Sequence, residues 1–465
     1  MSKSSRVTKR TYYEVHFKLA SPLCISSGTD NLADFDLMLD GEGKPFIPGT
    51  SIAGAFRNSL MDKKDKASVM GFSKVSKSSE TEDESEQIGR MSQILISDVS
   101  LVKNSSDNVN ISIRDGIKLE DNEKITAGTG KFDMQVVEPG AEGCMRFEVV
   151  ERENDDEADA NEKIKGFIID LAEGDIRLGA KKNRGFGKLK VIEVGEKEFD
   201  LTQKDQAEKW LDFLGYNASS YDEGFPAVEC TRYEEWKVGK EKYKDSYVKV
   251  KYAKIRVPLK LKGGISIRKY STRPGEADYE QLTIKEDEEG NRRIPVVPGS
   301  SWNGAIRGDA VRILRDSLGC NDYKEVINDW FGTVDKDDKD RTQQSKIVIS
   351  ESKIIGATEL PMTRVKINRF DSSAVAGALY SEISFFGGKT ELEIMVRVDK
   401  GEDYKAIMGL VYLVINDIMN GFVPIGGQTA VGRGIFTGSE IKEFGNLEID
   451  DCLASLKKYL EGRTK

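Results

Sequence analysis

Phe46-Ile-Pro-Gly-Thr-Ser-Ile-Ala-Gly-Ala-Phe-Arg57 decides the fold of this 465-residue chain, because Val296-Val-Pro-Gly-Ser-Ser-Trp-Asn-Gly-Ala-Ile-Arg307 repeats it 250 residues further on. In both segments a Pro-Gly turn leads to Ser or Thr, then to small residues and an arginine. A Ser or Thr cap predicts the start of a helix, and the amides at a helix start bind anions. The sequence therefore predicts two copies of one domain, each with an anion-binding helix start.

Other landmarks recur in the same order, which a chance match would not produce. Three pairs have similar offsets: Leu95-Ile-Ser-Asp98 with Val348-Ile-Ser-Glu351, Gly116-Ile-Lys118 with Arg364-Val-Lys366, and Leu178-Gly-Ala-Lys-Lys-Asn-Arg-Gly-Phe-Gly187 with Ile425-Gly-Gly-Gln-Thr-Ala-Val-Gly-Arg-Gly434. Duplicated domains diverge by insertions in the loops between such elements. We therefore predict a first domain at 1–195, a charged connector containing aromatic residues at 196–245, and a second domain at 246–465.

The net charge of −9 argues at first sight against a nucleic-acid-binding protein. The acidic residues, however, concentrate in runs such as Thr81-Glu-Asp-Glu-Ser-Glu86, which are typical of solvated loops. The glycine-rich segments contain Lys and Arg instead. The charge distribution is therefore compatible with a basic groove.

The five cysteines include no Cys-x-x-Cys pair, so we expect neither a disulfide framework nor a thiolate zinc site. The chain has a single histidine, His16, which we interpret as a strand residue. It contains no apolar run of the roughly 18 residues that a transmembrane helix needs, and its start has no signal-peptide core. We expect a soluble cytoplasmic protein.

Hydrophobic periodicity predicts the order β, β, α, β, β, α, β in each copy. The helices are expected at 50–63 and 162–173 in the first copy, and at 300–318 and 404–419 in the second. Strands are expected at 94–101 and 347–354. This order predicts an α+β fold with two tandem ferredoxin-like domains, each with its helices on one face of the sheet.

The repeated motifs resemble those of the type III CRISPR branch of the RAMP superfamily, specifically the Cas7 (Csm3-like) backbone subunits. The segments that carry the resemblance are 47–57, 114–118 with 130–133, and 178–187, and their counterparts are 297–307, 364–369 with 377–380, and 425–434. The resemblance implies modified RRM domains with β-hairpin thumbs that pack side by side along a CRISPR RNA (crRNA). Two fused subunits look like the tandem arrangement of type III-D-like effectors. The implied partners are crRNA, complementary target RNA and Cas10-like, Cas5-like and further Cas7-like subunits, without a membrane.

The resemblance also implies cleavage of target RNA by a loop aspartate with a divalent metal, Mg²⁺ or Mn²⁺. Asp34 occupies the expected position in the first copy, and Asp36 and Asp30 are close alternatives. Asp34 and Asp36 are two residues apart, so on a strand they would share a face and could hold the metal together. Asp278 is the corresponding residue of the second copy, although a longer turn follows it.

Three functions remain open at this point. A metal-dependent endoribonuclease and a catalytically inactive crRNA-binding scaffold use the same RNA-binding surface. A crRNA-processing endonuclease would usually need a histidine-centred site, and the single histidine disfavours it.

The candidate RNA-binding residues fall into three groups. The helix starts contribute Gly49, Thr50 and Ser51 with Arg57, and Gly299, Ser300 and Ser301 with Arg307. The glycine-rich loops contribute Lys181, Lys182 and Arg184, and in the second copy Arg433. The thumb-side candidates are Arg114, Lys118, Lys131, Arg364, Lys366 and Arg369.

Overall fold

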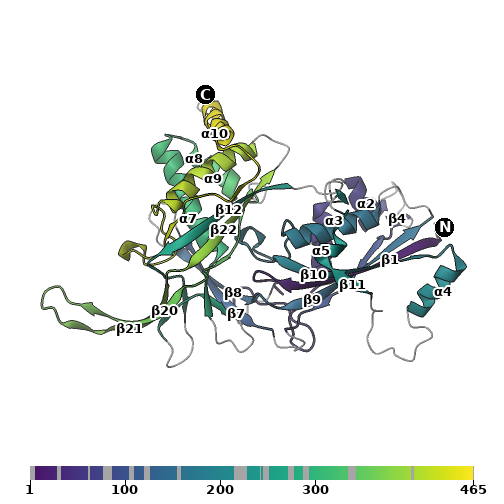
Figure 1. The fold of residues 1–465 in the computed structure, drawn as a ribbon, viewed down its shortest axis with the longest axis horizontal. Helices are drawn as coiled ribbons and strands as arrows, with labels where there is room; N and C mark the ends of the chain where they lie inside the picture. Colours follow the sequence, from purple (N-terminus) through teal and green to yellow (C-terminus); the bar gives the residue numbers. More distant parts are fainter. Residues whose placement is uncertain are drawn as a thin grey trace.

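The computed structural model describes residues 6–28, 33–60, 63–76, 86–103, 109–119, 126–153, 159–213, 228–240, 242–243, 251–270, 277–285, 293–333, 342–398 and 403–463. Two five-stranded sheets, one from each sequence repeat, carry the main helices (Figure 1). Below, "first repeat" means the described part of residues 6–243, and "second repeat" means that of residues 251–463.

The sheet of the first repeat is antiparallel throughout. Its order is β11 (Cys230–Arg232), β10 (Leu189–Asp200), β1 (Val7–Leu19), β9 (Glu142–Arg152) and β5 (Ile94–Ile96). Without β11, the order along the sheet is fourth, first, third and second strand of a β-α-β-β-α-β unit. This arrangement agrees with the predicted order of elements.

Helices α1 (Gly49–Ser59) and α3 (Ala160–Glu173) pack on one face of this sheet. Tyr13, Val15 and Phe17 alternate along β1 and are buried in the same core. Helix α1 ends at Ser59 and a separate helix α2 (Lys63–Met70) follows, so the single helix predicted at 50–63 is wrong at its end.

The second repeat has the same strand order. Its sheet runs β18 (Ile347–Ile349), β22 (Lys389–Val398), β12 (Lys251–Lys262) and β23 (Ile435–Thr437), with β24 (Glu443–Phe444) also paired to β12. Helices α7 (Gly299–Arg312) and α9 (Asp403–Met419) contribute to its core. Helices α8 (Tyr323–Phe331) and α10 (Ile449–Arg463) add to it, and a π-helical turn at Ile313–Ser317 extends α7.

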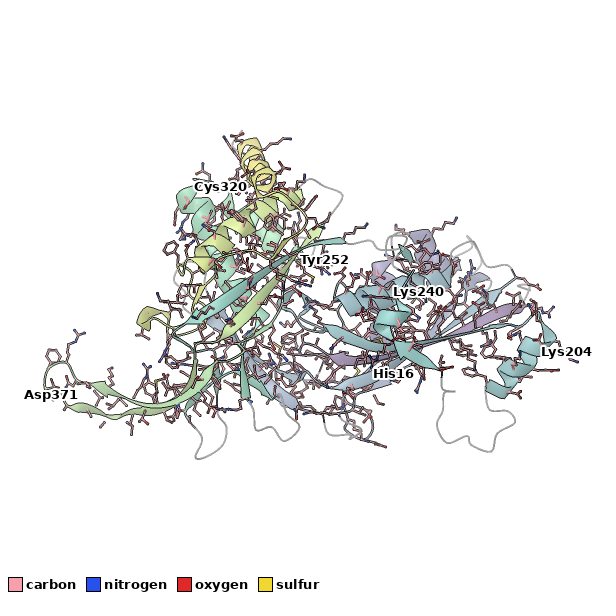
Figure 2. All side chains as sticks on the ribbon, in the orientation of Figure 1. His16, Lys204, Lys240, Tyr252, Cys320 and Asp371 are labelled. Atoms are coloured by element: carbon pink, nitrogen blue, oxygen red, sulfur yellow. The ribbon has the colours of Figure 1, made fainter. Side chains whose placement is uncertain are left out.

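Each repeat also has a long β-hairpin outside its main sheet. In the first repeat β7 (Ile111–Leu119) pairs with β8 (Thr126–Val137), and in the second β20 (Thr358–Ile367) pairs with β21 (Ala374–Phe386). The β20–β21 hairpin extends far from the body, with Asp371 at its tip (Figures 1 and 2). The thumb-side candidates Arg114 and Arg364 lie on these two hairpins.

The remaining strands are short. They are β2 (Phe46–Ile47), β3 (Phe72–Ser76), β4 (Glu86–Arg90), β6 (Val99–Ser100), β13 (Gly264–Ile265), β14 (Arg268–Tyr270), β15 (Tyr279–Gln281), β16 (Thr283–Lys285), β17 (Arg293–Val297) and β19 (Ser352–Lys353). The strands predicted at 94–101 and 347–354 are each two short strands, β5 with β6 and β18 with β19.

The described part of the connector folds onto the first repeat. Strand β10 continues to Asp200, so the boundary predicted at 195 falls inside a strand. Helix α4 (Lys204–Phe213) brings the Trp210 Nε1–H to 2.9 Å from the Tyr12 hydroxyl. Helix α5 (Tyr233–Trp236) buries Trp236 in the core of the first repeat. Burial of Trp236 and partial burial of Trp210 explain why the connector is not a simple linker.

Partly buried ion pairs and a buried hydrogen bond join the two repeats. Lys188 of the first repeat donates to the Glu393 carboxylate of the second at 2.9 Å, and Arg177 donates to Ser350 Oγ at 2.8 Å. Lys254 of β12 lies 2.7 Å from the Asp175 carboxylate. These contacts set the relative position of the two repeats at their junction.

Candidate nucleic-acid interface

The two helix starts differ from the predicted caps. Pro48 and Pro298, not Ser or Thr, occupy the N-cap positions, and neither makes a side-chain cap hydrogen bond. Thr50 and Ser51 therefore lie within the first turn of α1, as Ser300 and Ser301 do in α7. The Ser51 and Ser301 amides donate to the Pro48 and Pro298 carbonyls at 2.9 and 3.0 Å, so they are not free for phosphate.

The glycines at these starts serve close packing. The Gly49 amide donates to Asp98 Oδ1 at 2.6 Å, and a Cβ on Gly49 would lie 2.7 Å from the Ile96 carbonyl oxygen. A Cβ on Gly299 would lie 2.2 Å from the carbonyl oxygen of Arg184, in the other repeat. Asp98 already occupies the Gly49 amide, so the phosphate contact predicted for Gly49 is corrected. At Gly299 the close approach explains only why the position needs glycine.

The glycine-rich loops have the same backbone path in both repeats. Lys181 and Gln428 are left-handed, each with φ of 55°, and short 3₁₀ turns follow at Lys182–Arg184 and Thr429–Val431. Gly187 and Gly434 have φ of 75° and 72°. A Cβ on either glycine would lie within 2 Å of a carbonyl oxygen, at 1.8 Å and 1.9 Å respectively, so only glycine fits.

The first glycine-rich loop lies against the second repeat, since a Cβ on its Gly185 would lie 2.6 Å from the Glu351 amide nitrogen. Two of its cations each have a cation of the other repeat as a neighbour. The Arg184 pKa is lowered by burial and by the neighbouring Arg307 of α7. The Lys182 pKa is lowered by burial and by the neighbouring Arg397 of β22. We call Lys182, Arg184, Arg307 and Arg397 the junction cations. Like charges repel, and a polyanion on this surface would relieve the repulsion.

A groove lies beside the junction cations in the first repeat. Its volume is about 610 Å³, and its walls come from the 24–26 segment, helix α1 and the glycine-rich loop. Ser51 and Lys182 both line it. Arg57 lies in the last turn of α1 and is exposed. A hydroxyl and an ammonium group in the lining of one groove are suited to phosphate oxygens.

Asp34 pairs with Asp133, an acid that was not among the predicted catalytic residues. Its amide donates to Asp133 Oδ1 at 2.9 Å, and the Asp133 amide donates back to Asp34 Oδ2 at 2.9 Å. Asp36 is buried, and its Oδ1 accepts from the Ala33 amide at 2.9 Å. The carboxylate beside Asp34 is thus Asp133 of β8, and the shared face predicted for Asp34 and Asp36 is wrong. Asp30 lies outside the described residues.

The second repeat makes the same pairing with one carboxylate. Ser381 of β21 donates its amide to Asp278 Oδ2 at 2.7 Å, and the Asp278 amide donates to Ser381 Oγ at 3.2 Å. The hydrogen bonds from the Ser381 amide and hydroxyl lower the Asp278 pKa. The geometry makes Asp278 the counterpart of Asp34, and Ser381 the counterpart of Asp133.

Aromatic rings flank both acidic positions. The Lys181 ammonium lies over the rings of Phe35 and Phe132, at 5.1 and 4.8 Å from their centroids. In the second repeat Tyr279 and Tyr380 hold the same places, with their ring centroids 5.9 Å apart. One sequence signal for these rings is the match of Phe132-Asp133 to Tyr380-Ser381 next to the motifs.

Two predicted RNA-binding cations are internal. Arg114 is buried and pairs with Glu138 at 2.6 Å and with Glu351 of the second repeat. Arg433 is buried next to Glu382 and lies over the Phe386 ring at 4.4 Å. The prediction for Arg114 is corrected, because two carboxylates neutralise its charge inside the protein. Arg433 is buried but shares the Glu382 carboxylate with Arg364.

The other hairpin cations differ in their surroundings. Arg364 pairs with Glu382 at 2.9 Å and is partly buried. Lys366 and Arg369 are exposed on the β20–β21 hairpin, near Phe370, which is 92% exposed. Lys131 is exposed, 3.7 Å from the Asp115 carboxylate. Lys118 belongs to β7, but its side chain lies outside the described residues.

The protein thus has two sheets, each packed with helices, together with projecting hairpins and a cationic surface at the junction of its repeats. The family model of the RAMP superfamily matches residues 16–190 and 280–437, in both repeats. The chain belongs to the RAMP superfamily, whose members are RNA-binding subunits of CRISPR-associated complexes. No curated protein matches the chain. In the described part of the chain, no helix is both long and apolar enough to span a membrane.

Proposed function

We propose that this protein is a tandem Cas7-like backbone subunit of a type III CRISPR effector complex. In this proposal each repeat is one ferredoxin-like Cas7 domain, and the chain binds crRNA through its phosphates. The observation that carries the proposal is the junction cation cluster, which places Lys182 and Arg184 of one repeat beside Arg397 and Arg307 of the other. Phosphate contacts position a guide without reading its sequence, so sequence would be read by base pairing.

The presence of a hairpin in each repeat favours a guide RNA that is bound at intervals along its length. Each repeat has one, and the β20–β21 hairpin presents Lys366, Arg369 and Phe370 to solvent. Cations and an aromatic ring on an exposed hairpin can contact phosphates and stack on bases. Neighbouring subunits of the proposed complex, Cas10-like, Cas5-like and further Cas7-like, would extend the same RNA-binding surface.

Cleavage of target RNA is the second part of the proposal. The Asp34–Asp133 pair offers carboxylate oxygens, which are the donors that Mg²⁺ and Mn²⁺ prefer, so the residues fit such an ion. A bound ion would supply positive charge to the phosphate being cleaved. Phe35 and Phe132 next to these acids would hold an unstacked nucleotide in place.

The second repeat has a single carboxylate at this position, which favours a subunit whose two repeats have different roles. Ser381 replaces Asp133 there, so Asp278 has no acidic partner in this pairing. We therefore propose that the first repeat cleaves and that the second repeat chiefly holds the RNA. An entirely inactive scaffold is the alternative.

Cleavage is tested with the complex assembled on crRNA and given a labelled complementary RNA with Mg²⁺ or Mn²⁺. The wild-type complex is expected to yield discrete products that a chelator abolishes. The double variant Asp34→Ala with Asp278→Ala is expected to bind target RNA and to lose the products. Unchanged products in that variant contradict the aspartate assignment, and absence of products in the wild type supports the scaffold.

Guide binding is tested by replacing Lys182 and Arg184 with Ala in the full chain. We expect weaker crRNA binding and a salt dependence whose slope, log Kd against log salt, falls by about 0.7 for each lost phosphate contact. Lys204→Ala on α4 is the matched control, since Lys204 is a highly exposed cation far from the junction (Figure 2). Equal crRNA affinities and salt slopes for both variants would show that the junction cations do not bind the guide.

A further inference from the structure

The groove beside helix α1, of about 610 Å³ and called the α1 groove below, has a basic lining. Arg177 and Lys182 are its charged residues, and no aspartate or glutamate is found among the described residues that line it. The chain nevertheless has more acidic than basic residues, 79 against 70. A second groove, between the repeats, is lined by lysines and glutamates alike. The α1 groove therefore has the charge of an anion-binding site.

Arg177 is the buried cation of the α1 groove. It is 4% exposed, and its Nη1 is a buried atom without a hydrogen-bond partner in the described part of the chain. Its Nη2 donates to Ser350 Oγ at 2.8 Å, and the Glu393 carboxylate, 3.6 Å from Nη2, is shared with Lys188. Burial lowers the Arg177 pKa, and the Glu393 charge only partly opposes this effect. An anion in the groove would therefore offset a desolvation cost that the protein leaves uncompensated.

Three further donors line the same groove. Ser51 and Asn58 belong to helix α1, and Lys182 belongs to the glycine-rich loop. Ser51 lies in the first turn of this 11-residue helix, where the helix dipole favours negative charge. A guanidinium, an ammonium, a hydroxyl and an amide are donors with which proteins bind phosphate oxygens. The donor set therefore indicates a phosphate group.

The second repeat lacks this donor set. Pro424 stands there at the position of Arg177, and Gly308 at the position of Asn58. A phosphate contact that both repeats make with one RNA strand would recur in both copies. The α1 groove is therefore a feature of the first repeat, separate from the RNA-binding surface that the repeats share.

The charge and size of the groove suit a terminal phosphate better than a phosphate within a strand. A phosphomonoester carries about −1.5 to −2 charges at neutral pH, which matches two cations, whereas each phosphate within a nucleic-acid strand carries one charge. Small-molecule sites usually have volumes of roughly 300–1,000 Å³, and the α1 groove falls in this range. Ile25 and Ala55 add apolar wall for the remainder of a ligand.

We propose that the α1 groove binds a terminal phosphate group, that of a nucleoside monophosphate or of the end of an RNA strand. Arg177 donates to the phosphate from Nη1, and Lys182, Ser51 and Asn58 supply the other donors. This site goes beyond the binding of a guide through its strand phosphates and does not depend on it. Guide binding by the assembled complex can succeed or fail without deciding the result below.

Calorimetric titration of the full-length chain without RNA tests the proposal, with inorganic phosphate and AMP as probes. We expect both probes to bind and adenosine, which has no phosphate, not to bind. Lys182→Met and Arg177→Met should each weaken AMP binding by about 10- to 100-fold, the loss expected for one charge-assisted hydrogen bond. Arg177 also contacts Ser350, so melting curves without ligand show whether Arg177→Met is folded.

A short RNA with a 5′-phosphate or a 5′-hydroxyl end distinguishes the two sources of the phosphate. Binding of AMP assigns the site to a free nucleotide. A preference for the 5′-phosphorylated RNA that Lys182→Met abolishes, without binding of AMP, assigns it to an RNA end. Equal binding of the two RNAs, with no binding of AMP or inorganic phosphate, overturns the proposal.

Gly54→Leu blocks the groove without removing a donor. Gly54 lines the groove, and a Cβ on it would have no described atom within 4 Å, so the leucine side chain has room only in the groove or in solvent. Gly304→Leu is the matched control, because Gly304 is the counterpart of Gly54 in α7 and is equally open. We expect Gly54→Leu to lose at least 10-fold in affinity for the bound probe and Gly304→Leu to bind like the wild type. Wild-type affinity in both Gly54→Leu and Lys182→Met would refute the site.

Discussion

Asp34→Ala is expected to lower cleavage of guide-paired RNA at the first repeat by about 100- to 1,000-fold, the usual loss when one stabilising group is removed. Its carboxylate lies in the loop before the helix start and pairs with Asp133 of the hairpin, so its removal leaves one acid. Asp278→Ala is expected to change product formation much less, because the second repeat has Ser381 where the first has Asp133. Product mapping with single variants measures the difference.

Replacing Asp133 with Asn separates the effect of its charge from its structural role in the loop. Asp133→Asn keeps an oxygen that can accept from the Asp34 amide but removes the charge, so it should preserve the loop and reduce cleavage by about 10- to 100-fold. Full activity in Asp133→Asn would limit the catalytic acid to Asp34 alone. Equal losses in Asp34→Ala and Asp278→Ala would contradict the division of roles between the repeats.

Glu393→Gln is expected to lower the free energy of unfolding by about 3 kcal/mol, in the range for one partner of a buried ion pair. Burial alone would raise the Glu393 pKa, but Lys188, Ser350 and Arg177 together lower it to about 2. The side chain is 14% exposed, so solvent screens these charges little. Urea unfolding, followed by circular dichroism, measures the change.

The pH dependence of stability gives an independent check. Because the folded-state pKa of Glu393 is lowered, its contribution is complete above the ordinary value of about 4.5 and is lost as the pH falls towards 2. The wild type should therefore lose more stability than Glu393→Gln over this interval. Glu391→Gln is the control, since Glu391 is 45% exposed and pairs with Lys442, and it should cost less than about 1 kcal/mol. Parallel pH profiles for wild type and Glu393→Gln would contradict this account of the junction.

Local sequence determined the parts of the fold that depend on local geometry. The repeated Pro-Gly segments did begin helices, and the two glycine-rich loops did adopt one backbone path. Backbone preferences of Gly and Pro act within a few residues, so a motif is enough to predict them. The order of strands and helices followed from periodicity for the same reason.

The tertiary structure decided which side chains meet. Asp34 lies 99 residues before Asp133, and only the packing of the hairpin against the loop shows that they pair. Arg114 looked like a surface cation, yet Glu351 of the other repeat neutralises it. No spacing in the sequence predicts such partners, because they depend on strand register and on how the repeats dock.

The outer face of the first sheet shows the same division most clearly. The sequence correctly placed His16 in a strand. Only the register of β9, β1, β10 and β11 places Cys144 and Cys230 on either side of Glu14 and His16. The physical reason is that a sheet aligns side chains across its strands regardless of their distance along the chain.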